Sequence, residues 1–263
     1  RDSMTEPARQ KKPKPTSSQP EPLPGDGGAA GAFVRSATWA LPFVSIVAAL
    51  AMGAVYGVGT ALLTLAVLAV SKSTIGIPYF IAIAAGLVVA TVTLSLGSVS
   101  GAHLNPIVTI GLWSVRRVKT VPAVVYVAAQ LLGGIAAYYI FTYFINQTFD
   151  NVGKFEGRIL VAEAAGAFVF SLGWAAAVYQ RLEAGKAAAV VGMSLTLGIL
   201  VSAAGAGGII NPAVALGAHS WVWGTYVLGP ILGAIIGFNL YSLLFAPASE
   251  LVEEKTEKSA KKK

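Results

Sequence analysis

The chain has 263 residues, of which 55% are hydrophobic and only 12% are charged, and its mean hydropathy is +0.69. A soluble domain averages about 25% charged residues, so this composition excludes an ordinary soluble protein and is typical of membrane-spanning helices. Most of the basic residues behind the net charge of +7 lie near the two ends, which indicates membrane topology and gives no reason to expect a nucleic-acid partner.

The first segment, residues 1–35, contains five prolines by residue 22 and then a run of glycine and alanine. This composition is typical of a disordered tail, which we expect to lie in the cytoplasm. The apolar run at residues 36–70 is longer than the roughly 20 residues that one crossing requires. Pro42 is the point at which this run could divide into an interfacial segment and a true span. The alternative is a seventh span, which would place the two ends of the chain on opposite sides.

Six apolar segments of this chain are long enough to cross a bilayer. They lie at roughly 45–70, 78–97, 121–144, 159–180, 187–205 and 222–246. Two further apolar pieces, at 106–115 and 212–219, each follow an Asn-Pro pair and are too short to cross. Residues 247–263 are charged and end in three lysines, so we expect them to form a second cytoplasmic tail.

Six spans place both tails on one side of the membrane, and the basic residues favour the cytoplasm for that side. In the short loops, where the charge rule is strongest, five basic residues then lie inside and three outside. The inside residues are Arg116, Arg117, Lys119, Arg181 and Lys186, and the outside residues are Lys72, Lys154 and Arg158. We therefore expect a multi-pass protein of the cell membrane with both termini in the cytoplasm.

The chain reads as two related halves, at about 36–145 and 158–246. The segment SGAHLNPIVTIG, from Ser100, corresponds to AGGIINPAVALG, from Ala206. Three spans per half is an odd number, so the halves must be inserted in opposite directions. Such an inverted repeat builds its site near the bilayer midplane, where discontinuous helices meet.

The two Asn-Pro pairs, Asn105-Pro106 and Asn211-Pro212, supply these discontinuities. Asparagine is a strong N-cap, and proline at the first helical position loses no hydrogen bond, so each pair predicts a helix start. One such pair alone could equally be a loop turn, but two pairs with matching flanks favour two re-entrant half-helices. The predicted fold is an all-α integral membrane protein with six transmembrane helices, two half-helices and an inverted repeat of two three-helix halves.

With these motifs the sequence resembles the aquaporin family, also called the major intrinsic proteins, over roughly residues 50–246. SGAHLNP matches the first loop motif of the family, with Ile107 in place of the usual alanine, and INPA matches the second motif fully. VAEAAGAF matches the opening of the family's fourth span. The resemblance implies that residues 36–246 form a channel domain, embedded in the lipid bilayer, which assembles as a homotetramer with one pore per subunit.

By this resemblance, Asn105 and Asn211 direct amide N–H groups into the pore, where they donate to small neutral solutes. The facing half-helices make the centre positive and exclude protons and cations. The resemblance also implies that Glu163 supports a re-entrant loop, and we expect His103 to brace a loop or line the pore. Tyr56 stands where the family has a second glutamate in its first span.

The residues that correspond to the narrow outer filter of the family are Ala85, Ile199, Gly208 and Val214. Val214 replaces the usual arginine, and none of the four has a charged or polar side chain. We therefore expect a wider and more apolar filter, which could pass glycerol, urea, ammonia or dissolved gases. The filter could equally be plugged by Ile199 or impede water by dewetting.

The predicted function is a passive channel for water or small neutral solutes, with two alternatives. A proton- or ion-coupled secondary transporter also uses inverted repeats, but only Glu163 is an acidic residue well inside an apolar span. The other alternative is a non-conducting structural membrane protein.

The chain has no cysteine and no metal-binding spacing of histidine with carboxylates, so we expect no metal or other cofactor. We also expect no enzyme activity, because no nucleophile–base–acid grouping is present.

Overall fold

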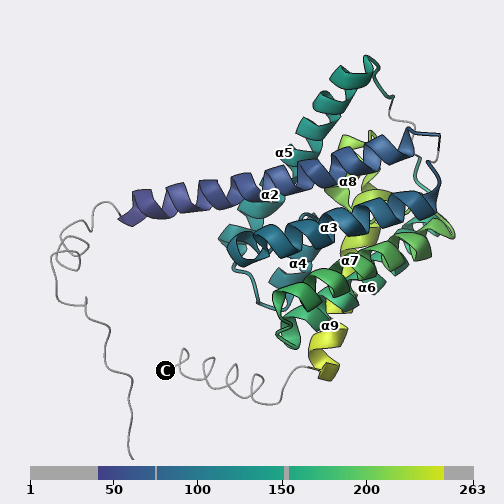
Figure 1. The fold of residues 1–263 in the computed structure, drawn as a ribbon. Coiled ribbons are helices and arrows are strands. Elements are labelled where there is room, and N and C mark those ends of the chain that lie inside the picture. The colour runs from purple at the N-terminus through teal and green to yellow at the C-terminus, as the bar shows by residue number, and fades with distance from the viewer. Residues whose placement is uncertain (1–40, 75, 151–153, 246–263) are drawn as a thin grey trace, which may run out of the picture. The chain divides into compact units, whose positions relative to one another are not determined.

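The computed structural model describes residues 41–74, 76–150 and 154–245, and the predicted tails at 1–35 and 247–263 lie outside these ranges. All regular structure in the described ranges is helical (Figure 1). The elements are α2 (Leu41–Ser71), α3 (Pro78–Ser100), α4 (Pro106–Ser114), α5 (Thr120–Ile145), α6 (Gly157–Tyr179), α7 (Ala184–Ala203), α8 (Pro212–Gly217), η2 (Trp223–Leu228) and α9 (Gly229–Phe245).

Six helical segments among the described residues are long and apolar enough to cross a membrane, which confirms the predicted number of spans. In the apolar run at residues 36–70, the part from Leu41 onward is a single helix, and residues 36–40 lie outside the described ranges, so the division at Pro42 stays a prediction. Pro42 is the second residue of α2, and proline is tolerated in the first turn because the N–H groups there have no partner within the helix.

The described residues from Val47 to Phe245 belong to one compact unit, in which the two halves of the repeat interlock. The short helix α4 of the first half packs against α9 of the second, and α8 of the second half packs against α5 of the first. A Cβ atom at Gly217 of α8 would lie 2.5 Å from the carbonyl oxygen of Gly134 in α5. Each half-helix is therefore held by the opposite half of the chain.

Small residues bring the long helices into backbone contact. A Cβ atom at Gly86 of α3 would lie 2.6 Å from the carbonyl oxygen of Gly192 in α7. A Cβ atom at Gly166 of α6 would lie 2.4 Å from the carbonyl oxygen of Gly198, also in α7. In a lipid environment such close approach provides the packing that stabilises helix pairs.

The last span begins with one turn of π-helix, η2, before α9 continues as a regular helix. Pro230, the second residue of α9, has no N–H to donate to the carbonyl of Tyr226 four residues earlier. The π-helix η2 therefore gives way to α9 at the point where Pro230 interrupts the regular hydrogen-bond ladder of an α-helix.

Candidate pore and selectivity filter

The two Asn-Pro pairs begin the two short helices. The Asn105 side-chain oxygen accepts a hydrogen bond from the Ile107 N–H at 3.1 Å, and Pro106 is the first residue of α4. The Asn211 side-chain oxygen accepts from the N–H groups of Ala213 and Val214 at 3.0 and 3.3 Å. Pro212 is likewise the first residue of α8. Each asparagine oxygen is thus used to cap its own helix.

The amide nitrogens of the same two asparagines tie the half-helices together. Asn105 Nδ2 donates to the Ile210 carbonyl at 3.0 Å, and Asn211 Nδ2 donates to the Leu104 carbonyl at 3.1 Å. Both asparagines are buried. A side-chain amide carries two N–H donors, so each asparagine keeps one N–H beyond this cross-loop bond. The sequence predicted amide donors at a common centre, and the structure shows that half of this donor capacity joins the two loops.

The backbone before each asparagine has the same strained conformation in both loops. Leu104 and Ile210 have φ angles of +49° and +39°, and Ala102 and Gly208, three residues before each asparagine, have +49° and +70°. Bulky or β-branched residues rarely adopt positive φ, and such strain persists only where the surroundings impose it. Leu104 and Ile210 present the two carbonyls of the cross-loop bonds. Sequence reasoning missed their role, because nothing in their residue types signals this conformation.

Glu163 of α6 holds the loop that precedes α8. Its side chain is fully buried, and it accepts hydrogen bonds from Ser202 Oγ at 3.0 Å, the Ile209 N–H at 3.1 Å and the Ile210 N–H at 2.6 Å. A buried carboxylate is tolerated when several donors satisfy it, because they replace the hydration that burial removes. These contacts position Ile210, whose carbonyl accepts the bond from Asn105.

The loop that precedes α4 has a neutral support. His103 Nδ1 lies 3.0 Å from Thr109 Oγ1, and Gln130 Nε2 of α5 donates to the same hydroxyl at 3.1 Å. The Ala102 N–H donates to Ser100 Oγ at 3.1 Å. Sequence reasoning missed Gln130, although a polar residue within an apolar span is itself a signal of a buried contact.

Aromatic rings surround His103 on its other sides. The ring of Tyr56 in α2 stacks on Tyr126 in α5 at 4.0 Å between centroids and lies 5.3 Å from the His103 ring. Trp174 of α6 meets the His103 ring edge-on at 5.6 Å. Tyr56 stands where the family resemblance implies a second glutamate. In this chain its ring packs against Tyr126 and His103.

The four predicted filter residues lie around one small cavity. Ala85 of α3, Ile199 of α7, Gly208 of the second loop and Val214 of α8 line it together with Asn211. The remaining lining residues are the apolar Leu63, Val67, Ile81, Leu195 and Ile209. The cavity measures about 20 Å³, which is room for about one water molecule.

The cavity is small, and apolar side chains make up most of its wall. Ile199 and Val214 are both buried branched residues and occupy the space around it. A Cβ atom at Gly208 would lie 2.9 Å from the Ile199 carbonyl oxygen and 3.1 Å from Ile199 Cγ2, so even alanine would crowd this point. The packing of Ile199 against Gly208 and Val214 thus leaves little free space at this point.

The model of the family described as "Major intrinsic protein" matches residues 37–241. The chain belongs to the major intrinsic protein family. Among similar relatives, aquaporin AqpM of Methanothermobacter thermautotrophicus is 32% identical over 187 residues, which cover 62% of this chain and 76% of the relative. Aquaporin Z of Photorhabdus laumondii is 32% identical over 191 residues, which cover 63% and 82%.

A solved structure supports the same fold. The X-ray structure of the aquaglyceroporin from Plasmodium falciparum aligns with a TM-score of 0.65 and 20% sequence identity, over 77% of this chain and 99% of that one. As a major intrinsic protein with six apolar spans in its described residues, the chain is a multi-pass membrane protein and a passive channel for water and small solutes. Membership in a family of channels does not favour the transporter alternative.

Proposed function

We propose that this member of the family conducts neutral molecules of about the size of water one at a time, through a filter formed by Ala85, Ile199, Gly208 and Val214. The observation that supports this proposal is the cavity of about 20 Å³ that these four residues line with Asn211. A space of this size holds about one water molecule, so permeants pass in single file.

The apolar walls of the filter select for weak hydration as well as for size. Asn211 is the one lining residue with a polar side chain, so a strongly hydrated solute loses hydrogen bonds there that the walls do not replace. Urea and glycerol are disfavoured on both counts, whereas ammonia and dissolved gases are small and weakly hydrated. Water passes against a dewetting barrier.

We assign ion exclusion to the midplane, where Asn105 and Asn211 meet at the starts of α4 and α8, with Pro106 and Pro212 as the first helical residues. The backbone N–H groups and amide donors there make the centre positive and repel cations. In this proposal Glu163 and His103 keep the two loops in place and do not contact the permeant.

The first test is solute flux into proteoliposomes, followed by stopped-flow light scattering and, for ammonia, by an internal pH dye. We expect the wild-type protein to raise water and ammonia flux above that of empty vesicles and to leave glycerol flux near it. Ile199→Ala removes three methyl or methylene carbons from the filter wall, so we expect it to raise glycerol flux at least several-fold.

Met193→Ala is the matched control, because Met193 is exposed on the same helix, α7, away from the filter. We expect it to keep the wild-type solute profile. Wild-type glycerol flux as high as water flux, or an Ile199→Ala variant that is folded and keeps the wild-type profile, would contradict the proposed filter.

We further propose that both termini are cytoplasmic in the cell membrane. Lys72 lies over the ring of Phe149 at 4.2 Å, so the connections after α2 and α5 share one face. Arg117 lies over the ring of Tyr179 at 4.7 Å, so the connections after α4 and α6 share another. The second face carries the larger number of short-loop basic residues, which favours the cytoplasm for it.

The remaining assignments follow from the family. We propose a channel domain at 36–246, flanked by cytoplasmic tails at 1–35 and 247–263, and assembly as a homotetramer with one pore in each subunit. Large apolar side chains are exposed on most of the long helices and are available for contacts with lipid and with neighbouring subunits. Native mass spectrometry of the detergent-solubilised protein tests the tetramer, and a monomer as the main species would contradict it.

A further inference from the structure

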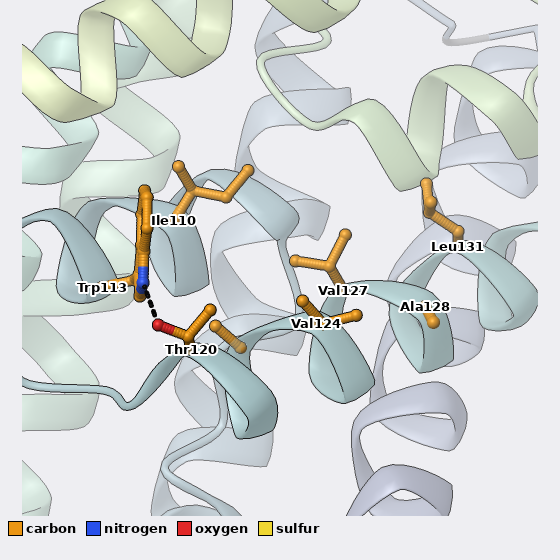
Figure 2. A pocket seen from close by; sticks show the side chains of 8 residues that line it. Ile110, Trp113, Thr120, Val124, Val127, Ala128 and Leu131 are labelled. Carbon is orange, nitrogen blue, oxygen red and sulfur yellow. Dashed lines mark hydrogen bonds between the residues drawn. The ribbon is translucent and has the colours of Figure 1, made fainter.

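An apolar groove runs along the outer side of the channel between α4 and α5, away from the filter. It has a volume of about 480 Å³ and is shown in Figure 2. Ile110 and Trp113 of α4 form one wall, and residues spaced three or four apart on α5, including Val124, Val127 and Leu131, form the other. This spacing places the α5 residues on one face of the helix.

The groove has the length of one leaflet. Its α5 wall extends from Thr120 to Leu131, which corresponds to a helix rise of about 16 Å. The hydrocarbon of one leaflet is roughly 15 Å deep, half of the bilayer core. The groove therefore matches an acyl chain in length.

The two polar side chains in the groove are joined by a hydrogen bond. Trp113 Nε1 donates to Thr120 Oγ1 at 3.0 Å, as Figure 2 shows, and every other lining side chain is apolar. An acyl chain in the groove would thus leave the Trp113 indole N–H paired with its acceptor.

One end of the groove opens into a basic pocket. This second pocket, of about 630 Å³, shares Trp113 and Thr120 with the groove and is also lined by Arg116 and Lys119. Its six lining residues include these two cations and no acidic residue. Hydrogen bonds from the Arg116 N–H to the Trp113 carbonyl at 2.9 Å and from the Arg117 N–H to the Leu112 carbonyl at 2.8 Å hold the turn that carries Arg116.

We propose that the groove and the basic pocket together bind one anionic phospholipid, with an acyl chain along α5 and the phosphate beside Arg116 and Lys119. Charge complementarity favours this occupant over a second copy of the chain. The described short loops on this face, together with the first turn of α7, carry five basic residues and, in Glu183, one acidic residue, so a second copy would bring mainly like charges to the pocket. The proposal concerns a surface outside the pore and does not depend on the proposed filter.

Native mass spectrometry of the purified full chain tests the site, with palmitoyl-oleoyl phosphatidylglycerol and the phosphatidylcholine of the same chains as probes. We expect the wild-type protein to bind phosphatidylglycerol more tightly by at least about tenfold. Arg116→Gln/Lys119→Gln should weaken phosphatidylglycerol binding roughly 30-fold, because each basic residue near an anionic headgroup contributes roughly fivefold. Phosphatidylcholine binding should change little.

Two further variants separate the groove from the pocket. Ala128→Trp fills the groove without changing charge and should weaken the binding of both lipids, whereas Leu132→Trp, at an exposed residue of α5 that does not line the groove, should not. Lys154→Gln/Lys186→Gln removes two charges elsewhere and is the control for net charge. Equal wild-type affinity for the two lipids overturns the proposal, as does unchanged phosphatidylglycerol binding in either the Arg116/Lys119 or the Ala128 variant.

Discussion

At the scale of single residues, the two re-entrant loops are supported by different chemistry. Glu163 holds the second loop with a fully buried carboxylate that accepts from a hydroxyl and two backbone N–H groups. The first loop is held by His103, Thr109 and Gln130, which are joined by hydrogen bonds between neutral or weakly basic groups. The two loops therefore share a backbone conformation, but only the second is held by an acidic side chain. Because three of its hydrogen bonds end on Glu163, the second loop depends more on one residue.

This dependence predicts a large effect of Glu163→Gln. The amide has one acceptor oxygen where the carboxylate has two, so at least one buried donor loses its partner. We expect the free energy of unfolding to fall by about 2–4 kcal/mol and the thermal unfolding temperature in detergent to fall with it. Glu183→Gln is the control, because Glu183 is 70% exposed in a 3.6 Å pair with Lys186, and we expect a change below about 0.5 kcal/mol. Equal shifts in the two variants would be inconsistent with the support role.

A second prediction at this scale concerns ion exclusion. In Asn211→Asp and Asn105→Asp a carboxylate oxygen replaces the nitrogen that faces the opposite loop's carbonyl, so the cross-loop bond is lost and the centre becomes negative. We expect proton or sodium leak into proteoliposomes to rise by roughly tenfold or more. Asn239→Asp, at an exposed residue of α9, is the control and should keep the low proton and sodium leak of the wild type. If both midplane variants are as ion-tight as the wild type, the exclusion is located elsewhere.

At the scale of helices, the half-helix α8 is held against α5 by backbone contact. A Cβ atom at Gly134 of α5 would lie 2.1 Å from the Ala213 carbonyl oxygen, and one at Gly217 of α8 would lie 2.5 Å from the Gly134 carbonyl oxygen. The contact joins rigid backbone to rigid backbone, so no side-chain movement can relieve an added methyl group. The position of α8, and with it Val214 at the cavity, therefore depends on the absence of side chains along this seam.

We predict that Gly134→Ala displaces α8, lowers the free energy of unfolding by about 3 kcal/mol and abolishes most water flux. Gly185→Ala is the matched control in α7, because a Cβ atom there has no neighbour within 4 Å. Alanine is favoured over glycine in helices, so this control should be neutral or slightly stabilising. Thermal unfolding and stopped-flow scattering measure the two effects, and a Gly134→Ala protein with normal stability and flux would contradict the seam.

At the scale of the whole molecule, the two halves of the repeat are entwined in the described unit. The half-helix of each half lies on the last long helix of the other, and each asparagine bonds to the opposite loop. Neither half can then complete its share of the pore alone. The loop contacts of Lys72 with Phe149 and of Arg117 with Tyr179 are consistent with spans that alternate in direction.

The sidedness of this arrangement can be tested with single cysteines, since the chain has none of its own. We predict that Lys119→Cys and Lys186→Cys react with a membrane-impermeant maleimide only after the cytoplasmic face is opened. Lys154→Cys should react in intact cells. Reaction of all three in intact cells, or the reverse pattern, would show that the assigned orientation is incorrect.

Sequence alone determined the large features of this protein, because each depends on local composition or on a short motif. Six long apolar segments predict six spans, since burying charge in hydrocarbon is costly and their sequences contain little of it. The two Asn-Pro pairs predicted two helix starts, because capping involves only neighbouring residues. The grouping of Ala85, Ile199, Gly208 and Val214 came from the family resemblance, and the structure brings these four residues to one cavity.

Only the tertiary structure decided how wide that cavity is and how the loops are joined. Width depends on how Ile199 and Val214 pack against residues from four separate segments, and a count of apolar residues does not contain that information. The positive φ angles of Leu104 and Ile210 run against their residue types and are imposed by contacts from the opposite half. Gln130 acquires its role only when α5 meets α4. In each case the deciding interaction joins residues far apart in the chain, so local sequence rules could not reveal it.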